Sequence, residues 1–240
     1  CTTYVIIGGS IADNFLNFEK SQALENNTRV QNLILHDLEQ LERFTADWAV
    51  WNDTYNFIET MNKEYEDSNL TAETFINANI DYVAFFNNEG VLIYDRKLAR
   101  EKAELLQLDS KTENTFFTIN KHHDSIPQFQ QAVTGLTKAN ESIIMFSHHT
   151  VSRTDQTGST GNGYLLFGKS FDQNYLEYLG QLSKLPISIH QNKENINKDG
   201  YVTTGYDEAL SFISLKDYRD KPLEVLALQH SRAISHYGEN

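Results

Sequence analysis

The feature that most constrains the fold of this chain is the stretch from Ile11 to Met61, which contains no proline and no glycine. Apolar residues recur along it at the spacing of one helix face, beginning at Phe15 and Phe18 and continuing to Ile58. The pattern predicts a single helix of about 75 Å, at about 1.5 Å per residue. A helix of that length overhangs its own domain, so its outer apolar stripe is expected to pack against the same helix of a second subunit.

The middle of this stretch is more polar and leaves a second interpretation open. Around Asn26 and Asn27 the apolar stripe weakens, and it resumes at Ile34 and Leu38. Two shorter helices, separated at the asparagines, would also fit this pattern. In the single-helix interpretation, Ile34 and Leu38 are expected at the contact between the subunits of a homodimer.

Charge and cysteine content narrow the class of partner. The chain carries 33 Asp and Glu residues against 20 Lys and Arg, which gives a formal net charge of −13. Nucleic acid and anionic membrane surfaces are recognised by clustered cations, so neither is an expected partner.

The single cysteine, Cys1, can form no internal disulfide and cannot build a thiolate metal site. No apolar run approaches the roughly 20 residues of a membrane-spanning helix.

After residue 62 the pattern changes to strands separated by turns. The apolar runs "DYVAFF" and "VLIYD" flank a short loop that ends in Gly90, which is typical of a β-hairpin. Thr71 is placed to cap a short helix that begins at Ala72. An antiparallel sheet with helices packed on it, an α+β fold, is the expected class. Helices are expected over 102–108, 125–133 and 172–185, and strands over 142–149, 163–171, 186–191, 209–215 and 223–231.

No motif for catalysis or metal binding fits its structural context. "GYLLFGKS" matches the phosphate-loop expression, but its four middle residues favour an extended strand over a tight loop. His148 and His149 lie in a predicted strand, where adjacent side chains point to opposite faces and cannot chelate one ion. The sequence offers no nucleophile with an adjacent base. We therefore predict no catalytic residue, no metal site and no cofactor.

Two groups of residues have the character of a ligand site, and the first surrounds the two tryptophans. Trp48, Trp51 and Tyr55 share the helix stripe, and Asp53 lies beside it. Such a stripe either packs as core or, where polar groups border it, completes a ligand cavity. We expect both tryptophans to be largely buried and to join the long helix to the sheet.

The second group lies at the end of the strand predicted over 142–149. His148 and Arg153 offer an imidazole and a guanidinium beside an apolar wall, and the guanidinium fork suits a carboxylate or a phosphate. We predict a pocket on the sheet face covered by residues 98–133, with His148 rather than His149 facing it and Arg153 closing over an anionic ligand. The alternative for Arg153 is a solvated hairpin tip.

The segments "ADWAVWNDTYNFI" and "NLTAETFINANIDYVAFFNNEGVLIY" resemble the signature of the type-four CHASE domain, an extracellular sensory module of histidine kinases and cyclases. "GNGYLLFGKSFDQNYLEYL" and "KDYRDKPLEVLALQHSRAISHYG" extend the likeness over most of the chain. The chain departs from the W-D-D-T-Y-like family element at Asn52, which replaces its first carboxylate. The likeness is strongest between Ala46 and Tyr94. Our candidate ligand contacts are Tyr94, Trp51, Asp53, Tyr55, His148 and Arg153.

The resemblance implies a PAS-like, Cache-type fold in which a long N-terminal helix packs on an antiparallel sheet with flanking helices. It implies a signalling and dimerisation helix over residues 1–62 and a sensor core over 63–240. It also implies a location outside the cell or in the periplasm, membrane contact only through flanking helices beyond this sequence, and a kinase or cyclase output domain elsewhere in the full-length protein. The expected function is small-molecule sensing. The alternatives are a structural or protein-interaction ectodomain that binds no ligand, and a hydrolase, for which the sequence lacks the site.

Overall fold

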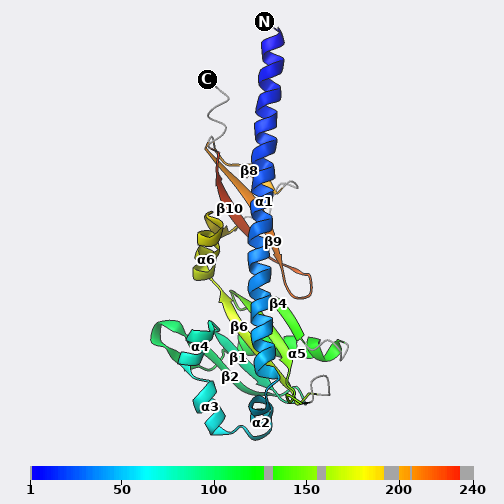
Figure 1. The fold of residues 1–240 in the computed structure, drawn as a ribbon, viewed down its shortest axis with the longest axis vertical. Coiled ribbons are helices and arrows are strands. Elements are labelled where there is room, and N and C mark those ends of the chain that lie inside the picture. Colours follow the sequence, from blue (N-terminus) through cyan, green and yellow to red (C-terminus); the bar gives the residue numbers. More distant parts are fainter. Residues whose placement is uncertain (1, 127–131, 156–160, 192–199, 206, 233–240) are drawn as a thin grey trace. The chain divides into compact units, whose positions relative to one another are not determined.

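The computed structural model describes residues 2–126, 132–155, 161–191, 200–205 and 207–232, and its elements are labelled in Figure 1. Contacts within the chain divide it into two compact units, each assembled from segments that are far apart in the sequence. The first unit comprises Cys1–Leu35, Gln173–Lys216 and Pro222–Asn240. The second unit comprises His36–Asp172 and Asp217–Lys221.

The N-terminal helix α1 (Thr2–Ala49) has 48 residues and contributes to both units. It is continuous through Asn26, so the interpretation with two helices separated there is wrong. The helix nevertheless ends before Met61, because a break separates it from α2 (Asn52–Thr60). Among the residues that the structure describes, no helix combines the length and the apolar character that crossing a bilayer requires.

Hydrogen bonds from a distant loop fix the end of α1. The Ser152 N–H donates to the carbonyl of Ala49 over 3.0 Å, and Thr154 Oγ1 donates to the carbonyl of Val50 over 3.5 Å. Carbonyls at a helix C-terminus lack an intrahelical donor, and these contacts supply one. Trp51 is extended (φ −138°, ψ 133°) and begins α2 as its N-cap. The break thus depends on tertiary contacts rather than on a glycine or proline.

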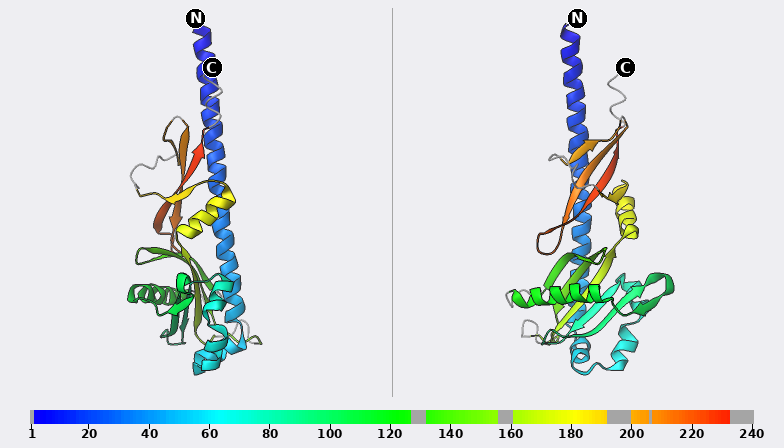
Figure 2. Two further views of the ribbon diagram at one scale, coloured as in Figure 1. Left: turned by 90° about the vertical axis from the view of Figure 1, so that its left-hand side faces the viewer. Right: turned by 180° about the vertical axis from the view of Figure 1, so that it is seen from behind.

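A six-stranded antiparallel sheet, in the order β3-β2-β1-β6-β5-β4, forms the centre of the second unit. The strands β1, β6 and β5 are buried along most of their length because the end of α1 covers one face of the sheet and α5 (Ser110–Ser125) covers the other (Figures 1 and 2). The stretch that matches the phosphate-loop expression forms β6, as its extended character predicted. The strands are β1 (Tyr82–Phe86), β2 (Leu92–Ala99), β3 (Glu104–Leu106), β4 (Ala132–Ala139), β5 (Ser142–Thr150) and β6 (Tyr164–Phe171).

The tryptophan pair joins α1 to this sheet. The ring of Phe167 on β6 lies 5.3 Å from Phe44 and 5.5 Å from Trp48, both on α1. The Trp48 ring meets Trp51 edge-on at 6.0 Å. Both tryptophans are partly rather than fully buried. The predicted joint between long helix and sheet is confirmed by these contacts.

The opposite face of the sheet is covered by α5 (Ser110–Ser125), a helix that the sequence pattern did not reveal. Its buried residues include Phe116, Ile119 and His123, which share one helix face despite the polar residues between them. Asp109 caps it by accepting from the N–H groups at positions 111 and 112. The sequence also predicted a helix over 125–133. This prediction is wrong for its last two residues, because β4 begins at Ala132. The helix expected over 102–108 is instead the 3-10 turn η1 (Arg100–Lys102) followed by β3.

Three short helices precede β1. They are α2, α3 (Lys63–Asn69) and α4 (Ala72–Ala78). Thr71 caps α4 as predicted, since its side chain accepts from the N–H of Thr74 over 3.2 Å. Phe57 of α2 is 1 % exposed, and it anchors these helices to the sheet through rings on β1 and β2.

The first unit contains a four-stranded antiparallel sheet in the order β7-β10-β9-β8. The first part of α1 is tied to it by buried polar contacts, because Asn27 Nδ2 donates to the Phe212 carbonyl over 3.1 Å and its Oδ1 accepts from Ser211 over 2.6 Å. The α+β class with a long N-terminal helix, an antiparallel sheet and flanking helices is confirmed. The elements are α6 (Gln173–Ser183), β7 (Ile187–Ile189), β8 (Tyr201–Thr203), β9 (Glu208–Lys216) and β10 (Pro222–Ser231).

Candidate ligand-binding site

A cavity of about 380 Å³ lies in the second unit, bounded by α2 and α3. Met61 ends α2 in the left-handed conformation (φ 50°), and the side chain of Asn62 caps α3 by accepting from the Tyr65 N–H over 2.7 Å. This tight reversal sets the two helices beside each other. The cavity is lined by Trp51, Asp53, Asn56, Asn62, Glu64, Tyr65, Ser68 and Asn69.

Aromatic rings give the cavity a rigid wall. Tyr65 is 4 % exposed, and its ring stacks on Phe57 at 4.6 Å and lies 5.9 Å from Trp51. Its hydroxyl shares a 2.8 Å hydrogen bond with Thr54. Burial raises the pKa of Tyr65 well above its usual range, so the phenol stays neutral.

The polar side chains of the cavity divide into two sets. Asn62 is held by its cap, and Asn69 Nδ2 donates to the Tyr65 carbonyl over 3.2 Å. The other set, Asp53, Asn56, Glu64 and Ser68, makes no side-chain hydrogen bond or ion pair within the described part of the chain. Their donors and acceptors are therefore available to a bound molecule.

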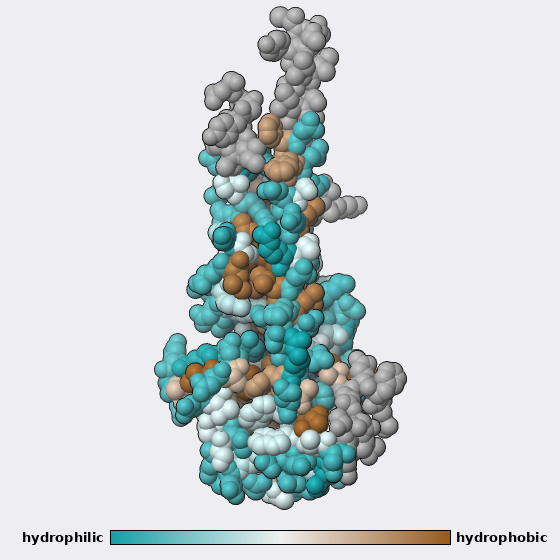
Figure 3. All heavy atoms as spheres, in the orientation of Figure 1, coloured by the Kyte–Doolittle hydropathy of each residue, from teal (hydrophilic) through white to brown (hydrophobic). Residues whose placement is uncertain are grey.

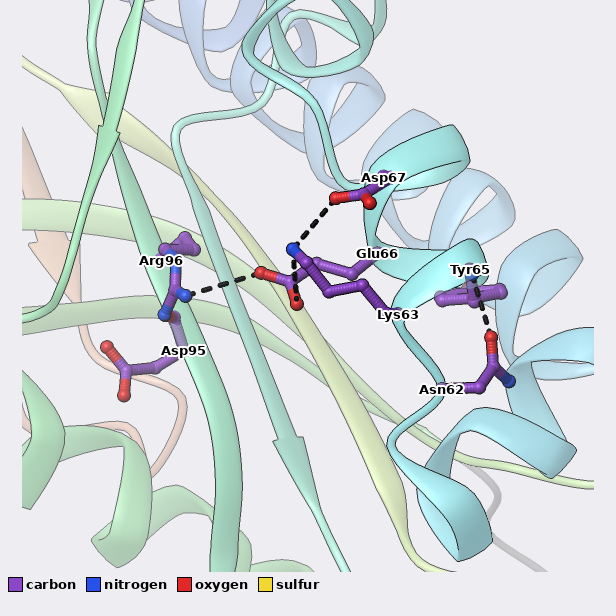
Figure 4. A network of polar contacts seen from close by, with 7 residues as sticks. All are labelled: Asn62, Lys63, Tyr65, Glu66, Asp67, Asp95 and Arg96. Atoms are coloured by element: carbon purple, nitrogen blue, oxygen red, sulfur yellow. Dashed lines mark hydrogen bonds and ion pairs between the residues drawn. The ribbon is translucent and has the colours of Figure 1, made fainter.

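An ion-pair network occupies the other side of α3 (Figure 4). Lys63 Nζ lies 2.8 Å from Asp67 and 3.5 Å from Glu66, and Arg96 donates to Glu66 over 3.4 Å. Lys63 and Tyr65 are two positions apart on a helix, so their side chains project to different sides. The hydrogen bond to Asp67 is the main cause of a raised pKa of Lys63. The network thus holds Lys63 and Arg96 in ion pairs on the side of α3 that faces away from the cavity.

The six predicted ligand contacts lie at different places. Trp51 and Asp53 line the cavity. The guanidinium of Arg153 lies over the Tyr55 ring, with 4.5 Å between Arg153 Cζ and the ring centroid. Tyr94 lies beneath Arg96 at the same 4.5 Å spacing, and its ring packs 5.6 Å from Phe57. Burial raises the pKa of Tyr94 to about 12.

His148 lies on the other face of the sheet, against α5. It is fully buried, and its Nδ1 lies 2.6 Å from His123 Nδ1 while its Nε2 lies 3.1 Å from Asn120 Oδ1. Because a carbonyl oxygen only accepts, His148 Nε2 donates to Asn120, and its Nδ1 accepts from His123. The structure therefore does not bring His148 together with Arg153.

Several lining residues and the histidine pair were not predicted from the sequence. Asn62 is the N-cap of α3, and asparagine is one of the residue types favoured at that position, which was a signal for the start of α3. Within the described ranges, no group of three or more His, Cys, Asp or Glu side chains is arranged to hold a metal ion.

The buried histidine predicts a pH-dependent stability. Burial, and then the charges of His123 and His149, hold the pKa of His148 well below its ordinary value of 6.5. His148 therefore binds a proton more readily in the unfolded chain than in the folded one. The free energy of unfolding falls as the pH drops below the ordinary histidine pKa towards the lowered pKa of His148 in the folded chain. We expect His148→Gln to flatten this loss in urea unfolding between pH 7 and pH 5, about the window where an ordinary histidine titrates. Superimposable wild-type and variant profiles would contradict the assignment.

The comparisons with known proteins give the context for this geometry. The family model described as "CHASE4 domain" matches residues 33–190. A methanogenesis regulatory histidine kinase, FilI of Methanothrix harundinacea, is 24% identical over 155 residues, which are 64% of this chain and only 17% of that protein.

Two solved structures share the fold. The extracellular domain described as belonging to the histidine kinase vpHK1S-Z8 has a TM-score of 0.60 at 13% identity, covering 93% of this chain and 99% of that one. The ligand-binding domain of the Campylobacter jejuni chemoreceptor Tlp3, solved in complex with L-valine, has a TM-score of 0.52 at 9% identity, covering 94% and 97%. At 13% and 9% identity, the similarity to these two structures shows a shared fold and nothing more specific.

Proposed function

Because the chain belongs to the CHASE4 domain family, we propose that it is the extracellular or periplasmic sensor domain of a membrane-bound signal-transduction protein of the histidine kinase or cyclase type. In this proposal it binds a small molecule and relays the signal through α1. The kinase or cyclase activity belongs to an output domain elsewhere in the full-length protein, and membrane contact is made only by flanking helices outside this sequence. Residues 1–62 serve as the signalling segment, the last part of which also lines the cavity, and 63–240 form the rest of the sensor core.

The cavity bounded by α2 and α3 is the observation that carries ligand binding. Its volume of about 380 Å³ suits a small metabolite, and it combines an aromatic wall with four polar side chains that lack a partner in the described part of the chain. The complex of the Tlp3 domain with L-valine supports a ligand of metabolite size. An anionic ligand would depend on Arg153, since the described residues lining the cavity include no lysine or arginine.

Contacts within the second unit provide a route from the cavity to α1. A molecule in the cavity touches Trp51, and Trp51 meets Trp48 near the end of α1 at 6.0 Å. A ligand that favours one position of Trp51 would bias the position of that helix end. Differential binding of this kind typically supplies about 1–3 kcal/mol of coupling.

The relay further requires a homodimer through α1. Figure 3 shows apolar residues among hydrophilic ones on the face that carries α1. Leu24 is 40% exposed and Leu35 is 56% exposed. They are about three turns apart on one side of the helix. Ile34, expected at the subunit contact, is only 5% exposed within the single chain, so we place Leu35 there instead.

Disulfide cross-linking in the full-length membrane protein tests the dimer. In a Cys1→Ser background, Leu35→Cys is expected to cross-link the subunits under mild oxidation, because its side chain points outward. Ile34→Cys is the matched control, and it is expected to cross-link far less because that side chain is buried in its own subunit. Equal cross-linking at the two positions, or none at either, would count against a dimer through this stripe.

A thermal-shift screen of the 240-residue chain with small metabolites tests ligand sensing. A ligand at 100 times its dissociation constant should add about 2.7 kcal/mol to the free energy of unfolding. If a broad panel gives no stabilisation, the alternative of a structural or protein-interaction ectodomain is favoured.

A further inference from the structure

We propose that the cavity bounded by α2 and α3 takes a small organic cation, a molecule with one or more protonated amines, and this inference rests on the proposed sensor function. Its basis is the juxtaposition of two carboxylates and a tryptophan ring in one cavity. Nothing in the family match or in the fold comparisons assigns a charge to the ligand.

The charge balance of the lining is the first argument. Asp53 and Glu64 both line the cavity, and neither has an ion-pair partner within the described part of the chain. The described lining residues include no lysine or arginine. An anion entering the cavity would meet two like charges, whereas a cation would satisfy both.

The nearby cations do not neutralise these carboxylates. Lys63 is held by Asp67 at 2.8 Å, and Arg96 by Glu66 at 3.4 Å. Figure 4 shows Lys63 turned towards those two acidic side chains and away from Tyr65 and Asn62. Arg153 lies over the Tyr55 ring. The negative charge of the cavity is thus left for a ligand.

Hydrogen-bonding capacity points the same way. An ionised carboxylate accepts only, so Asp53 and Glu64 present four acceptor oxygens and no donor. Asn56 and Ser68 each add both a donor and an acceptor. Acceptors therefore exceed donors, and a complementary ligand is rich in N–H groups. An ammonium group, with three donors and no acceptor, fits that requirement.

The aromatic wall adds a second kind of recognition. Tryptophan is the side chain whose ring face attracts cations most strongly. Trp51 lines the cavity beside Tyr65, with the two rings tilted by 49°. A ligand with a short apolar chain and a terminal amine would contact the ring and the carboxylates together.

Three four-carbon probes of different charge test the proposal: 1,4-diaminobutane, 1,4-butanediol and succinate. Calorimetric titration of the 240-residue chain is expected to show the diamine binding at least about tenfold more tightly than the diol, a difference of about 1.4 kcal/mol. Succinate is expected to show no saturable binding. Asp53→Asn and Glu64→Gln should each weaken diamine binding by about tenfold and leave diol binding unchanged.

Glu59→Gln is the matched control. Glu59 is an exposed α2 carboxylate outside the cavity lining, so its loss should leave diamine affinity unchanged. Equal weakening by Glu59→Gln would assign the binding to the general negative charge of the chain and overturn the proposal. Failure of the diamine to bind, or a diol or succinate that binds as tightly, would overturn it too. The sensor function would stand if another metabolite bound in the cavity, so the two failures are distinguishable.

Discussion

Phe116→Ala is expected to destabilise the second unit by about 3–5 kcal/mol, whereas the same change at the next residue, Phe117, should cost about 0.5 kcal/mol or little more. Phe116 is a fully buried residue of α5 and meets the Tyr82 ring of β1 edge-on at 6.0 Å. Its removal leaves a cavity in the core between α5 and the sheet. Phe117 is 39% exposed, with Lys121 over its ring.

Urea unfolding followed by tryptophan fluorescence measures this contrast. Trp48 and Trp51 are the two tryptophans of the chain, and both belong to the second unit, so their emission reports its unfolding. Since the two phenylalanines are neighbours on one helix, helix propensity changes equally in both variants. Equal losses of stability would show that α5 does not pack on the sheet through this face.

Arg100→Met is expected to cost about 3 kcal/mol, the lower end for breaking a buried ion pair. The Asp81 side chain is 8% exposed, and its carboxylate lies 2.5 Å from Arg100 Nε. It also accepts from the Ser170 N–H over 2.7 Å. Without the guanidinium, a nearly buried charge keeps a single backbone donor from β6. The lower end is appropriate because Arg100 itself is 42% exposed.

A double-mutant cycle separates the lost pair from the lost packing. Asp81→Asn removes the charge, and its amide oxygen can still accept from the Ser170 N–H. The double variant Asp81→Asn/Arg100→Met should therefore recover about 1–3 kcal/mol relative to Arg100→Met alone. Strict additivity of the two changes would mean that the buried charge is not what makes Arg100 important.

Elements with regular apolar spacing could be predicted from the sequence. The long helix and the antiparallel sheet follow from such patterns, and the cap at Thr71 follows from local side-chain chemistry. The end of α1 could not be predicted, because it depends on Ser152 and Thr154, which are about a hundred positions away. Helix α5 was missed because its buried face is carried by few apolar residues.

The candidate site was only partly predictable for the same reason. Trp51 belongs to the aromatic stripe of the sequence and Asp53 lies beside that stripe, and both residues line the cavity. Tyr65 and Ser68 reach it only because the chain reverses at Met61, a non-glycine residue with positive φ. His148 and Arg153 were expected in one pocket because they are close in the sequence. Their actual neighbours belong to α5 and α2, which are positioned by the fold as a whole.

The most direct test of ligand binding in this cavity is to fill it. Ser68 is an exposed residue that lines the cavity, so Ser68→Trp should block entry without opening the core. Ser21→Trp, at an exposed position of α1, is the matched control. Metabolites that stabilise the wild-type chain in the thermal-shift screen should still stabilise Ser21→Trp and should no longer stabilise Ser68→Trp. If Ser68→Trp is stabilised as strongly as the wild type, the ligand binds elsewhere, and sensing through the cavity bounded by α2 and α3 is contradicted.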